Sequence, residues 1–437
     1  MPDAVMTEAS RYAARRARLA DWLGDGVAVI ATAPEAARNR DTHYPYRFDS
    51  YFYHLTGFTE PEAVLVVTGG AAPQSILFCR DKDETREIWD GFRYGPAAAQ
   101  GEFGFDAAYS VSELDARLPE LLGNRARLAY ALGHDPAWDA RMMGWLNAVR
   151  AKARQGVTAP GEMLDVRALL DELRLHKDAG EIDTMRRSAQ IATEAHRRAM
   201  RATRPGRHEY EIEAEILHAF YAAGAQAPAY QSIVAGGANA CVLHYVTNRD
   251  ALRDGDLLLI DAGCELDGYA SDITRTFPVN GRFSAAQKDA YEVVLAAQAA
   301  AIAAVKPGAT WIAPHDAAVR VLTQGMIDLG LLKGEVDGLI ESNAFSRFYM
   351  HRTGHWLGLD VHDAGEYKQQ GDWRALAPGM TLTVEPGLYI RPADDVPAAF
   401  HNIGIRIEDD VAVTATGCEV LTAPPKTVDE IETWMRG

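Results

Sequence analysis

Two aspartates lie in a segment that should otherwise be buried and apolar. Asp261 follows directly on the apolar stretch 257–260, and Asp272 precedes Ile273 eleven residues later. An apolar run of this kind predicts a strand that is buried on both faces. Because an ionised carboxylate is costly to bury unless it is paired or bound to a metal, these acids predict a site with chemistry of its own.

The segment around Asp261 has a counterpart later in the chain. The stretches ALRDGDLLLIDAG and ALAPGMTLTVEPG align without gaps, so that Asp261 falls on Glu385. A second strand pattern follows each stretch and carries an acid, Asp272 after the first and Glu408, in IGIRIEDD, after the second. Two similar hairpins would give this pattern, and so would two half-domains related by a pseudo-twofold axis whose four acids meet at the centre.

Histidines cluster between the two pairs of acids. The stretch HRTGHWLGLDVHD contains His351, His355 and His362, and its glycines allow a close approach of the backbone. Four carboxylates that share a site cannot all stay ionised without compensation, and two divalent cations would balance them. Oxygen ligands with one imidazole suit Mn²⁺, while Zn²⁺, Co²⁺ and Fe²⁺ are also possible. A lone histidine would more often be structural, but this cluster predicts a metal site.

Other sequence patterns give no sign of a second catalytic or binding site. Asp409 and Asp410 follow Glu408 directly, and we expect both to face solvent. The stretch VAGGANA lacks the Lys-Ser/Thr of a phosphate-binding loop, which favours a simple turn. The chain has no Gly-x-Ser-x-Gly motif, and this disfavours a serine hydrolase of the α/β type.

The patterns of helices and strands place these residues in the second of two domains. The first part opens with an amphipathic helix over 7–23 and then alternates short strands, such as 27–31, with helical patterns, which is typical of an α/β domain. Asp178 stands three residues before Glu181, and this spacing predicts a capped helix start. Longer helices mixed with strands follow and predict an α+β domain. The predicted domains are 1–176 and 177–437.

Composition excludes several classes of protein. A chain of 437 residues exceeds what one hydrophobic core usually supports, and the net charge of −17 disfavours binding to nucleic acid. No apolar run approaches the roughly 20 residues that a membrane helix needs, and the N-terminus lacks the apolar region of a signal peptide. The four cysteines are far apart and form no CxxC pair, so we expect free thiols in a reducing cytoplasm.

The order of the acids and histidines, with the motifs around them, resembles one known family. The motifs IDAG, SDITRTF, GHWLGLDVHD, TVEPGLY and IGIRIEDD resemble those of the pita-bread metallopeptidases, family M24. The stretch YPYRFDSYFYHLTGFTEPEAVLV resembles the N-terminal domain of the aminopeptidase P branch of that family. The resemblance covers nearly the whole chain. It implies an α/β N-terminal domain and an α+β catalytic domain of the creatinase and methionine aminopeptidase type, with pseudo-twofold symmetry.

The resemblance also implies a centre with two divalent metal ions, most commonly Mn²⁺. Asp261 would bind one ion, His355 and Glu385 would bind the other, and Asp272 and Glu408 would bridge them. Hydroxide formed at such a centre attacks the scissile carbonyl. The implied activity is release of the N-terminal residue from peptides that have proline in the second position.

Further residues are implied to act on the peptide. His351 and His362 would donate hydrogen bonds to the carbonyl oxygen or the tetrahedral intermediate, and Glu385 would shuttle a proton. The residues implied to line the substrate pocket are His244, Tyr389, Arg406 and, from a neighbouring subunit, Trp89. The contribution of a second subunit implies a homo-oligomer, most simply a tetramer.

Three other functions fit the same family resemblance. A prolidase has the same fold and metals but acts on Xaa-Pro dipeptides, and a comparison of dipeptides with tripeptides separates the two enzymes. A metal-free peptide-binding protein and a creatinase-like enzyme without metals also occur on this fold. All five implied ligand positions hold an acid or a histidine, which disfavours both metal-free alternatives.

Overall fold

The computed structural model describes residues 8–436, which belong to two compact units, Met1–Leu173 and Arg174–Gly437. Thr7, where the first helix was expected to begin, lies outside the described residues. The domain boundary between residues 176 and 177 stays a prediction. Within residues 8–436, every helix is too short or too polar to cross a membrane.

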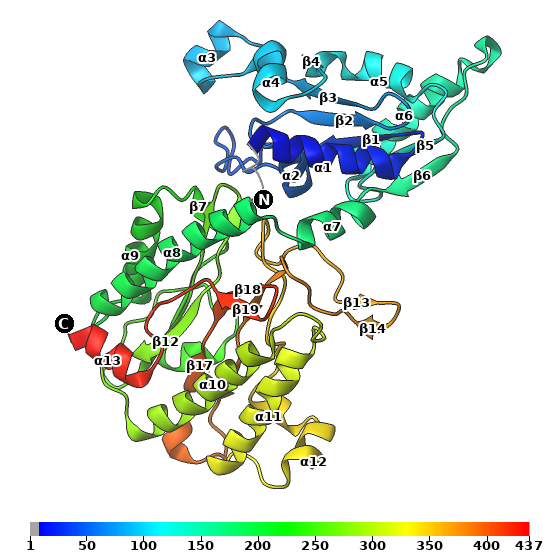
Figure 1. Ribbon diagram of the computed structural model, residues 1–437. Coiled ribbons are helices and arrows are strands. Elements are labelled where there is room, and N and C mark those ends of the chain that lie inside the picture. Colours follow the sequence, from blue (N-terminus) through cyan, green and yellow to red (C-terminus); the bar gives the residue numbers. More distant parts are fainter. Residues whose placement is uncertain (1–7, 437) are drawn as a thin grey trace. The chain divides into compact units, whose positions relative to one another are not determined.

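The first unit is built on a mixed six-stranded sheet (Figure 1). The order across the sheet is β4-β3-β2-β1-β5-β6, and only β2 runs antiparallel to its neighbours. The strands are β1 (Gly26–Ala31), β2 (Val64–Thr68), β3 (Gln74–Cys79), β4 (Ala107–Ser110), β5 (Arg127–Tyr130) and β6 (Glu162–Asp165). Helices alternate with these strands, which confirms the predicted α/β class.

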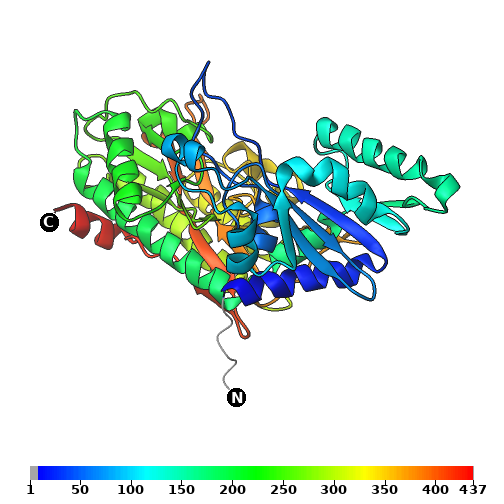
Figure 2. The ribbon, with the colours of Figure 1, turned by 90° about the horizontal axis from the view of Figure 1, so that it is seen from above.

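Helices cover both faces of this sheet because the strands are apolar on both sides. In β1, Val27 and Val29 pack into one core, and Ala28 and Ile30 pack into the other. Helices α5 (Leu114–Leu122) and α6 (Pro136–Arg150) contribute to the first core. The helices that contribute to the second core are α1 (Glu8–Leu23), α2 (Ser50–Thr56), α4 (Gly95–Phe103) and α7 (Arg167–Leu175). Figure 2 shows this sheet with helices on its two sides.

Long helices surround small sheets in the second unit, as an α+β domain requires. Asp178 and Glu181 form the predicted capping box, in which each side chain accepts a hydrogen bond from the other residue's backbone N–H. Helix α8 packs beside α9, and α10 packs beside α11. The helices are α8 (Ala179–Ala202), α9 (Glu209–Ala222), α10 (Ala285–Ala304), α11 (Ala313–Asp328), α12 (Val336–Glu341) and α13 (Val428–Arg436).

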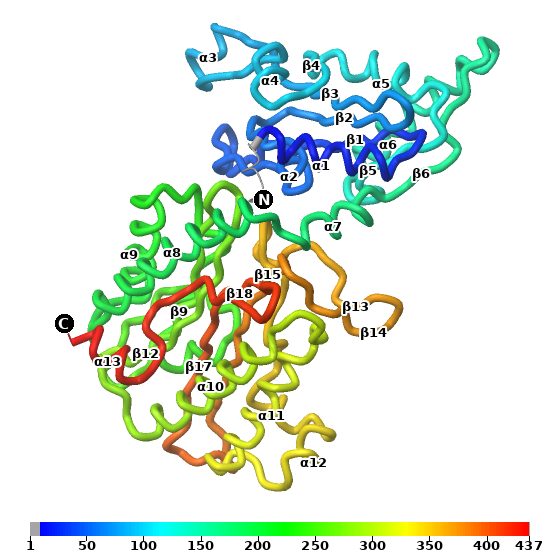
Figure 3. Tube along the Cα trace, in the orientation of Figure 1, coloured from blue at the N-terminus to red at the C-terminus, as the bar shows by residue number. Residues whose placement is uncertain are grey.

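Two antiparallel strand pairs in the second unit carry the segments that repeat in the sequence, and their strands are labelled in Figure 3. Strand β9 pairs with β12 so that Asp261 lies opposite Thr274, and β15 pairs with β18 so that Val384 lies opposite Asp409. Strand β16 pairs with β17, and β8 and β19 extend the two repeated pairs. The strands are β8 (Ile233–Gly236), β9 (Leu257–Asp261), β12 (Thr274–Pro278), β15 (Thr381–Val384), β16 (Gly387–Ile390), β17 (Ile403–Arg406), β18 (Asp409–Val413) and β19 (Cys418–Val420).

Candidate metal centre

The repeated strand pairs bring four acids to one place. Asp261 ends β9 and Asp272 lies two residues before its partner β12, while Glu385 follows β15 and Glu408 precedes its partner β18. All four line a pocket of about 450 Å³ together with His355. The acids that are far apart in the sequence therefore meet, as the internal repeat suggested.

Three of these side chains could hold one cation. Asp272, His355 and Glu408 each offer a ligand atom, and these atoms lie within 4.8 Å of one another. Nε2 of His355 lies 3.4 Å from Asp272 and 3.9 Å from Glu385. Nδ1 of His355 lies 2.9 Å from the carbonyl oxygen of Trp356, which can only accept. The proton therefore sits on Nδ1, which leaves Nε2 for a cation in the neutral imidazole.

The acids are not balanced by the positive groups around them. Burial and the charge of Asp272 raise the pKa of Glu408 well above its ordinary range. Burial also raises the pKa of Glu385 to about 7, against the opposing charges of His355 and Arg406. Raised pKa values of this kind indicate an excess of negative charge in a low-dielectric site. Divalent cations would remove that excess, so the residues present fit a metal centre.

Asp261 differs from the other acids because a guanidinium touches it. Burial would raise the pKa of Asp261, but Arg406 and the hydroxyl of Tyr230 outweigh it and lower that pKa. Arg406 donates to Asp261 at 2.5 Å, and the single hydroxyl hydrogen of Tyr230 lies within reach of both Asp261 and Asp272. For Asp272, burial and the charge of Asp261 raise the pKa.

Tyr230 and Thr274 are site residues that the sequence did not single out. Tyr230 joins Asp261 and Asp272, and Thr274 donates to Glu408 at 2.7 Å. Thr274 lies within the SDITRTF motif, where its position opposite Asp261 could have been inferred. Tyr230 lies 31 residues before Asp261 in an unremarkable stretch, so no local signal could have identified it.

Backbone contacts fix the loop that carries the histidines. The carbonyl of Thr353 accepts from the backbone N–H of Glu385 at 2.8 Å, and Thr383 Oγ1 accepts from the N–H of His355 at 3.1 Å. A Cβ atom at Gly354 would lie 2.1 Å from the carbonyl oxygen of Thr383. This close approach is the one that the glycines of the motif predicted.

The implied catalytic and substrate residues lie around the same pocket. His244, His351, His362 and Arg406 line it. The hydroxyl of Tyr389 accepts from Arg406 at 3.0 Å and lies 2.8 Å from Nε2 of His351. Burial and the charge of Arg406 lower the pKa of His351 to about 4, so this imidazole is neutral near pH 7.

Trp89 stands apart from this group. It lies on α3 (Glu84–Asp90) in the first unit and is 80% exposed. Its implied contact with a neighbouring subunit stays a prediction, as do the individual roles of the other site residues.

The expectation that Asp409 and Asp410 face solvent is wrong. Their relative exposures are 0% and 2%, because β18 lies in the middle of its sheet between β15 and β19. Asp409 meets Arg275 at 2.6 Å and Lys426 at 2.7 Å. The carboxylate of Asp410 accepts from the backbone N–H of Asp272 at 3.1 Å, so it supports a residue of the pocket.

Comparisons with known proteins agree with the fold. The family model of metallopeptidase family M24 matches residues 183–415, and that of the aminopeptidase P N-terminal domain matches residues 12–130. The fold is therefore the pita-bread fold behind an N-terminal domain of the aminopeptidase P type. The chain belongs to metallopeptidase family M24.

Individual relatives resemble this chain over almost their full length. The chain is 46% identical to a Xaa-Pro aminopeptidase of Escherichia coli over 98% of its own length and 99% of that protein. Its structure matches the aminopeptidase PepP of Pseudomonas aeruginosa with a TM-score of 0.97, 51% identity and 99% coverage of both chains. A zinc-substituted E. coli aminopeptidase P in complex with product matches with a TM-score of 0.96, 45% identity and 98% coverage of both chains.

Proposed function

We propose that the chain is a metal-dependent aminopeptidase that releases the N-terminal residue from peptides with proline in the second position. The observation that carries this proposal is the convergence of Asp261, Asp272, His355, Glu385 and Glu408 on one pocket. Similar proteins from E. coli and Haemophilus influenzae, each 46% identical to this chain, are named Xaa-Pro aminopeptidases.

We assign two divalent cations to this pocket, with Mn²⁺ preferred. Asp261 would hold one ion, His355 and Glu385 the other, and Asp272 and Glu408 would be shared. Carboxylate oxygens with one imidazole suit Mn²⁺ and accept Zn²⁺, Co²⁺ or Fe²⁺. The raised pKa values of Asp272 and Glu408 support the assignment, since they reflect negative charge that the chain leaves unbalanced. Bound cations of this kind polarise a carbonyl and lower the pKa of water.

Three residues are assigned to the chemical step. Glu385 lines the pocket and would take up and release a proton during hydrolysis. His362 and His351 line the same pocket and would donate to the carbonyl oxygen and the tetrahedral intermediate, where charge develops. The single N–H of the neutral His351 ring lies on the carbonyl oxygen of Arg352, 2.7 Å from Nδ1, so His351 would donate to the substrate in exchange for that bond.

His244, Tyr389 and Arg406 are assigned to the slot for the proline ring. The Xaa-Pro amide has no N–H, so the slot needs no hydrogen-bond acceptor for that amide and selects proline by fitting its ring. We further propose that Trp89, which is 80% exposed, completes the slot of a neighbouring subunit in a homotetramer. The four cysteines are free, which supports a cytoplasmic location.

A peptide panel tests this proposal. Purified, metal-loaded protein would be offered a tripeptide Xaa-Pro-Yaa, the matched tripeptide Xaa-Ala-Yaa and the dipeptide Xaa-Pro, with release of free Xaa as the measurement. We expect rapid release from the proline tripeptide and slow release from the alanine analogue. Rapid turnover of the dipeptide alone would identify a prolidase instead, and equal rates on both tripeptides would contradict the proline slot.

A further inference from the structure

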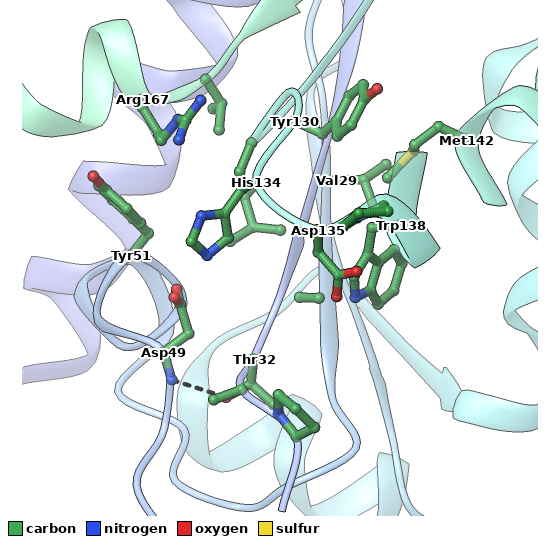
Figure 4. A pocket seen from close by; sticks show the side chains of 17 residues that line it. Val29, Thr32, Asp49, Tyr51, Tyr130, His134, Asp135, Trp138, Met142 and Arg167 are labelled. Carbon is green, nitrogen blue, oxygen red and sulfur yellow. Dashed lines mark hydrogen bonds between the residues drawn. The ribbon is translucent and has the colours of Figure 1, made fainter. Parts of the chain in front are cut away.

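The first unit contains a cavity of its own, separate from the pocket just described. Its volume is about 510 Å³, within the range of roughly 300–1,000 Å³ that small-molecule sites occupy. Residues at the carboxyl ends of β1, β5 and β6 line it, among them Ala31, Tyr130 and Val166 (Figure 4). We call this cavity the strand-end crevice.

The topology of the sheet explains why the strand-end crevice exists. Strands β1 and β5 are parallel neighbours, but the connections that follow them lead to opposite faces of the sheet. Phe52 and Leu55, on α2 after β1, pack into the core on one face, whereas Met142 and Leu146, on α6 after β5, pack into the core on the other. Connections that diverge in this way open a crevice at the carboxyl ends of the strands, where open α/β sheets bind ligands.

The charges of the lining residues favour a positively charged ligand. The guanidinium of Arg167 forms a two-pronged ion pair with Asp165 at 2.5–3.1 Å, so its charge is already balanced. Asp49 and Asp135 also line the crevice. Among the residues that the structure describes, no lysine lines it and Arg167 is the only arginine. Asp49 makes interactions of its own, so the charge left over in the lining is the negative charge of Asp135.

Asp135 and Trp138 form the most distinctive corner of the crevice. Asp135 caps α6 by accepting from the backbone N–H of Ala137 at 2.8 Å through Oδ1. Its Oδ2 atom has no hydrogen-bond partner among residues 8–436. Trp138 follows on the first turn of the same helix, and Figure 4 shows its indole ring on the same side as the Asp135 carboxylate. The Asp135 carboxylate suits an organic cation through a charge-assisted hydrogen bond. The indole ring, which Arg141 already contacts at 5.0 Å from its centroid, offers an apolar wall beside it.

The walls around this corner suit a flat apolar body. Val29, Tyr130 and Met142 are buried and line the crevice. The imidazole of His134 also faces it, between the Asp135 corner and Tyr51 in Figure 4. An aromatic amine would place its ring against these apolar side chains and its ammonium group on Asp135.

We propose that the strand-end crevice is a binding site for a small organic cation with a flat apolar body, such as an aromatic amine. The site is independent of peptide hydrolysis, because its lining comes wholly from the first unit and the candidate metal ligands all belong to the second.

Titration calorimetry of the full chain with phenethylamine tests this site. We expect saturable binding to the wild-type chain and no binding of phenylacetate, which carries the same ring with the opposite charge. The variant Asp135→Asn should bind phenethylamine about tenfold more weakly, since a hydrogen bond to a charged group contributes about that factor. Asparagine caps a helix as well as aspartate does, so this variant should fold normally.

A matched variant controls for the loss of one charge at a helix start. Asp83 caps α3 in the same unit and does not line the crevice, so Asp83→Asn should bind phenethylamine as the wild type does. Both variants should release Xaa from the tripeptide Xaa-Pro-Yaa at the same rate as the wild-type chain, whatever that rate is. Absence of saturable binding, equal affinity in Asp135→Asn, or equal binding of phenylacetate would each overturn the proposal.

Discussion

Glu408 and Asp409 are adjacent and both buried, yet their surroundings favour opposite charge states. Asp409 lies between Arg275 and Lys426, and these two cations hold its pKa below the ordinary value in spite of burial. Burial and the charges of the other acids raise the pKa of Glu408 well above its ordinary value, and the hydroxyl of Thr274 is its hydrogen-bond donor. One acid is balanced by the chain, and the other needs a cation from outside.

The comparison distinguishes buried acids that the chain balances with cations from buried acids that it leaves unbalanced. The second unit repeats the balanced arrangement at Asp363, which meets Arg174 and Lys177 and also has a lowered pKa in spite of burial. The balanced pair at Asp409 also contacts the unbalanced acid next to it, since Arg275 donates to the backbone carbonyl oxygen of Glu408 at 2.6 Å. Balanced pairs therefore support the backbone from which the unbalanced acids project.

Removal of an unbalanced acid should have the largest effect on activity. We expect Asp272→Ala to lower kcat/KM on an Xaa-Pro-Yaa peptide by at least about a thousandfold, because a metal ion contributes several kcal/mol to the transition state. Bound metal should fall as well, by elemental analysis of the purified variant. The exposed acid Asp337, altered to Ala, serves as the control and should leave both values unchanged. A variant with substantial activity and the full complement of metal would contradict the assignment of Asp272.

Removal of a balancing cation should instead destabilise the folded protein. Arg275→Leu leaves Asp409 buried with Lys426 as its remaining cation, beside the neutral donors Gln298 and Thr422. Breaking a buried ion pair in this way costs about 3–5 kcal/mol. Denaturant unfolding of the metal-free protein measures the loss. Asp272→Ala should leave the free energy of unfolding unchanged or raise it under the same conditions, because it relieves repulsion. Equal losses in the two variants would remove the distinction between the two kinds of acid.

The metal-free protein should lose stability as pH rises through the range in which Glu385 titrates. Its pKa is about 7 in the folded state and 4.5 ordinarily, so the folded chain holds a proton that the unfolded chain has released. The stability present below about pH 4.5 is therefore lost as pH rises to about 7, by roughly 3 kcal/mol. The lowered pKa of Asp261 acts at lower pH, outside this window.

Thermal unfolding with and without Mn²⁺ measures this effect. Metal-bound acids stay ionised, so the gain in Tm on adding Mn²⁺ should grow between about pH 5 and about pH 8. A gain that is constant with pH would show that the acids of the pocket carry no unbalanced charge.

The smallest loss of stability is expected from removal of Lys426, the more exposed of the two cations at Asp409. Lys426 is about one-third exposed and shares Asp409 with the fully buried Arg275. Lys426→Met should therefore destabilise the protein by only about 1 kcal/mol, as measured by denaturant unfolding. A loss as large as that of Arg275→Leu would mean that Asp409 depends on both cations equally.

Local patterns were sufficient to predict the elements and the acids at their ends. The capping box of Asp178 and Glu181 is a signal within four residues, and the structure confirms it. The acids Asp261 and Glu385 were found because each directly follows an apolar strand pattern, and the internal repeat related the two. Such signals depend only on neighbouring residues, so they survive without knowledge of the fold.

Contacts between distant segments could not be predicted in the same way. Asp409 was expected to face solvent because its partner Arg275 is 134 residues away in the sequence. Tyr230 was missed because its role depends on a hydroxyl that reaches two acids on another strand pair. The strand-end crevice likewise follows from the directions in which two connections leave a sheet, and no motif marks it.

Metal removal and restoration test the central claim most directly. The protein would be stripped with a chelator, its metal content verified, and Mn²⁺ titrated back while release of Xaa from an Xaa-Pro-Yaa peptide is measured. The unbalanced acids predict no activity in the stripped protein and a return of activity in proportion to the metal bound. Full activity in protein shown to be free of metal would contradict the account.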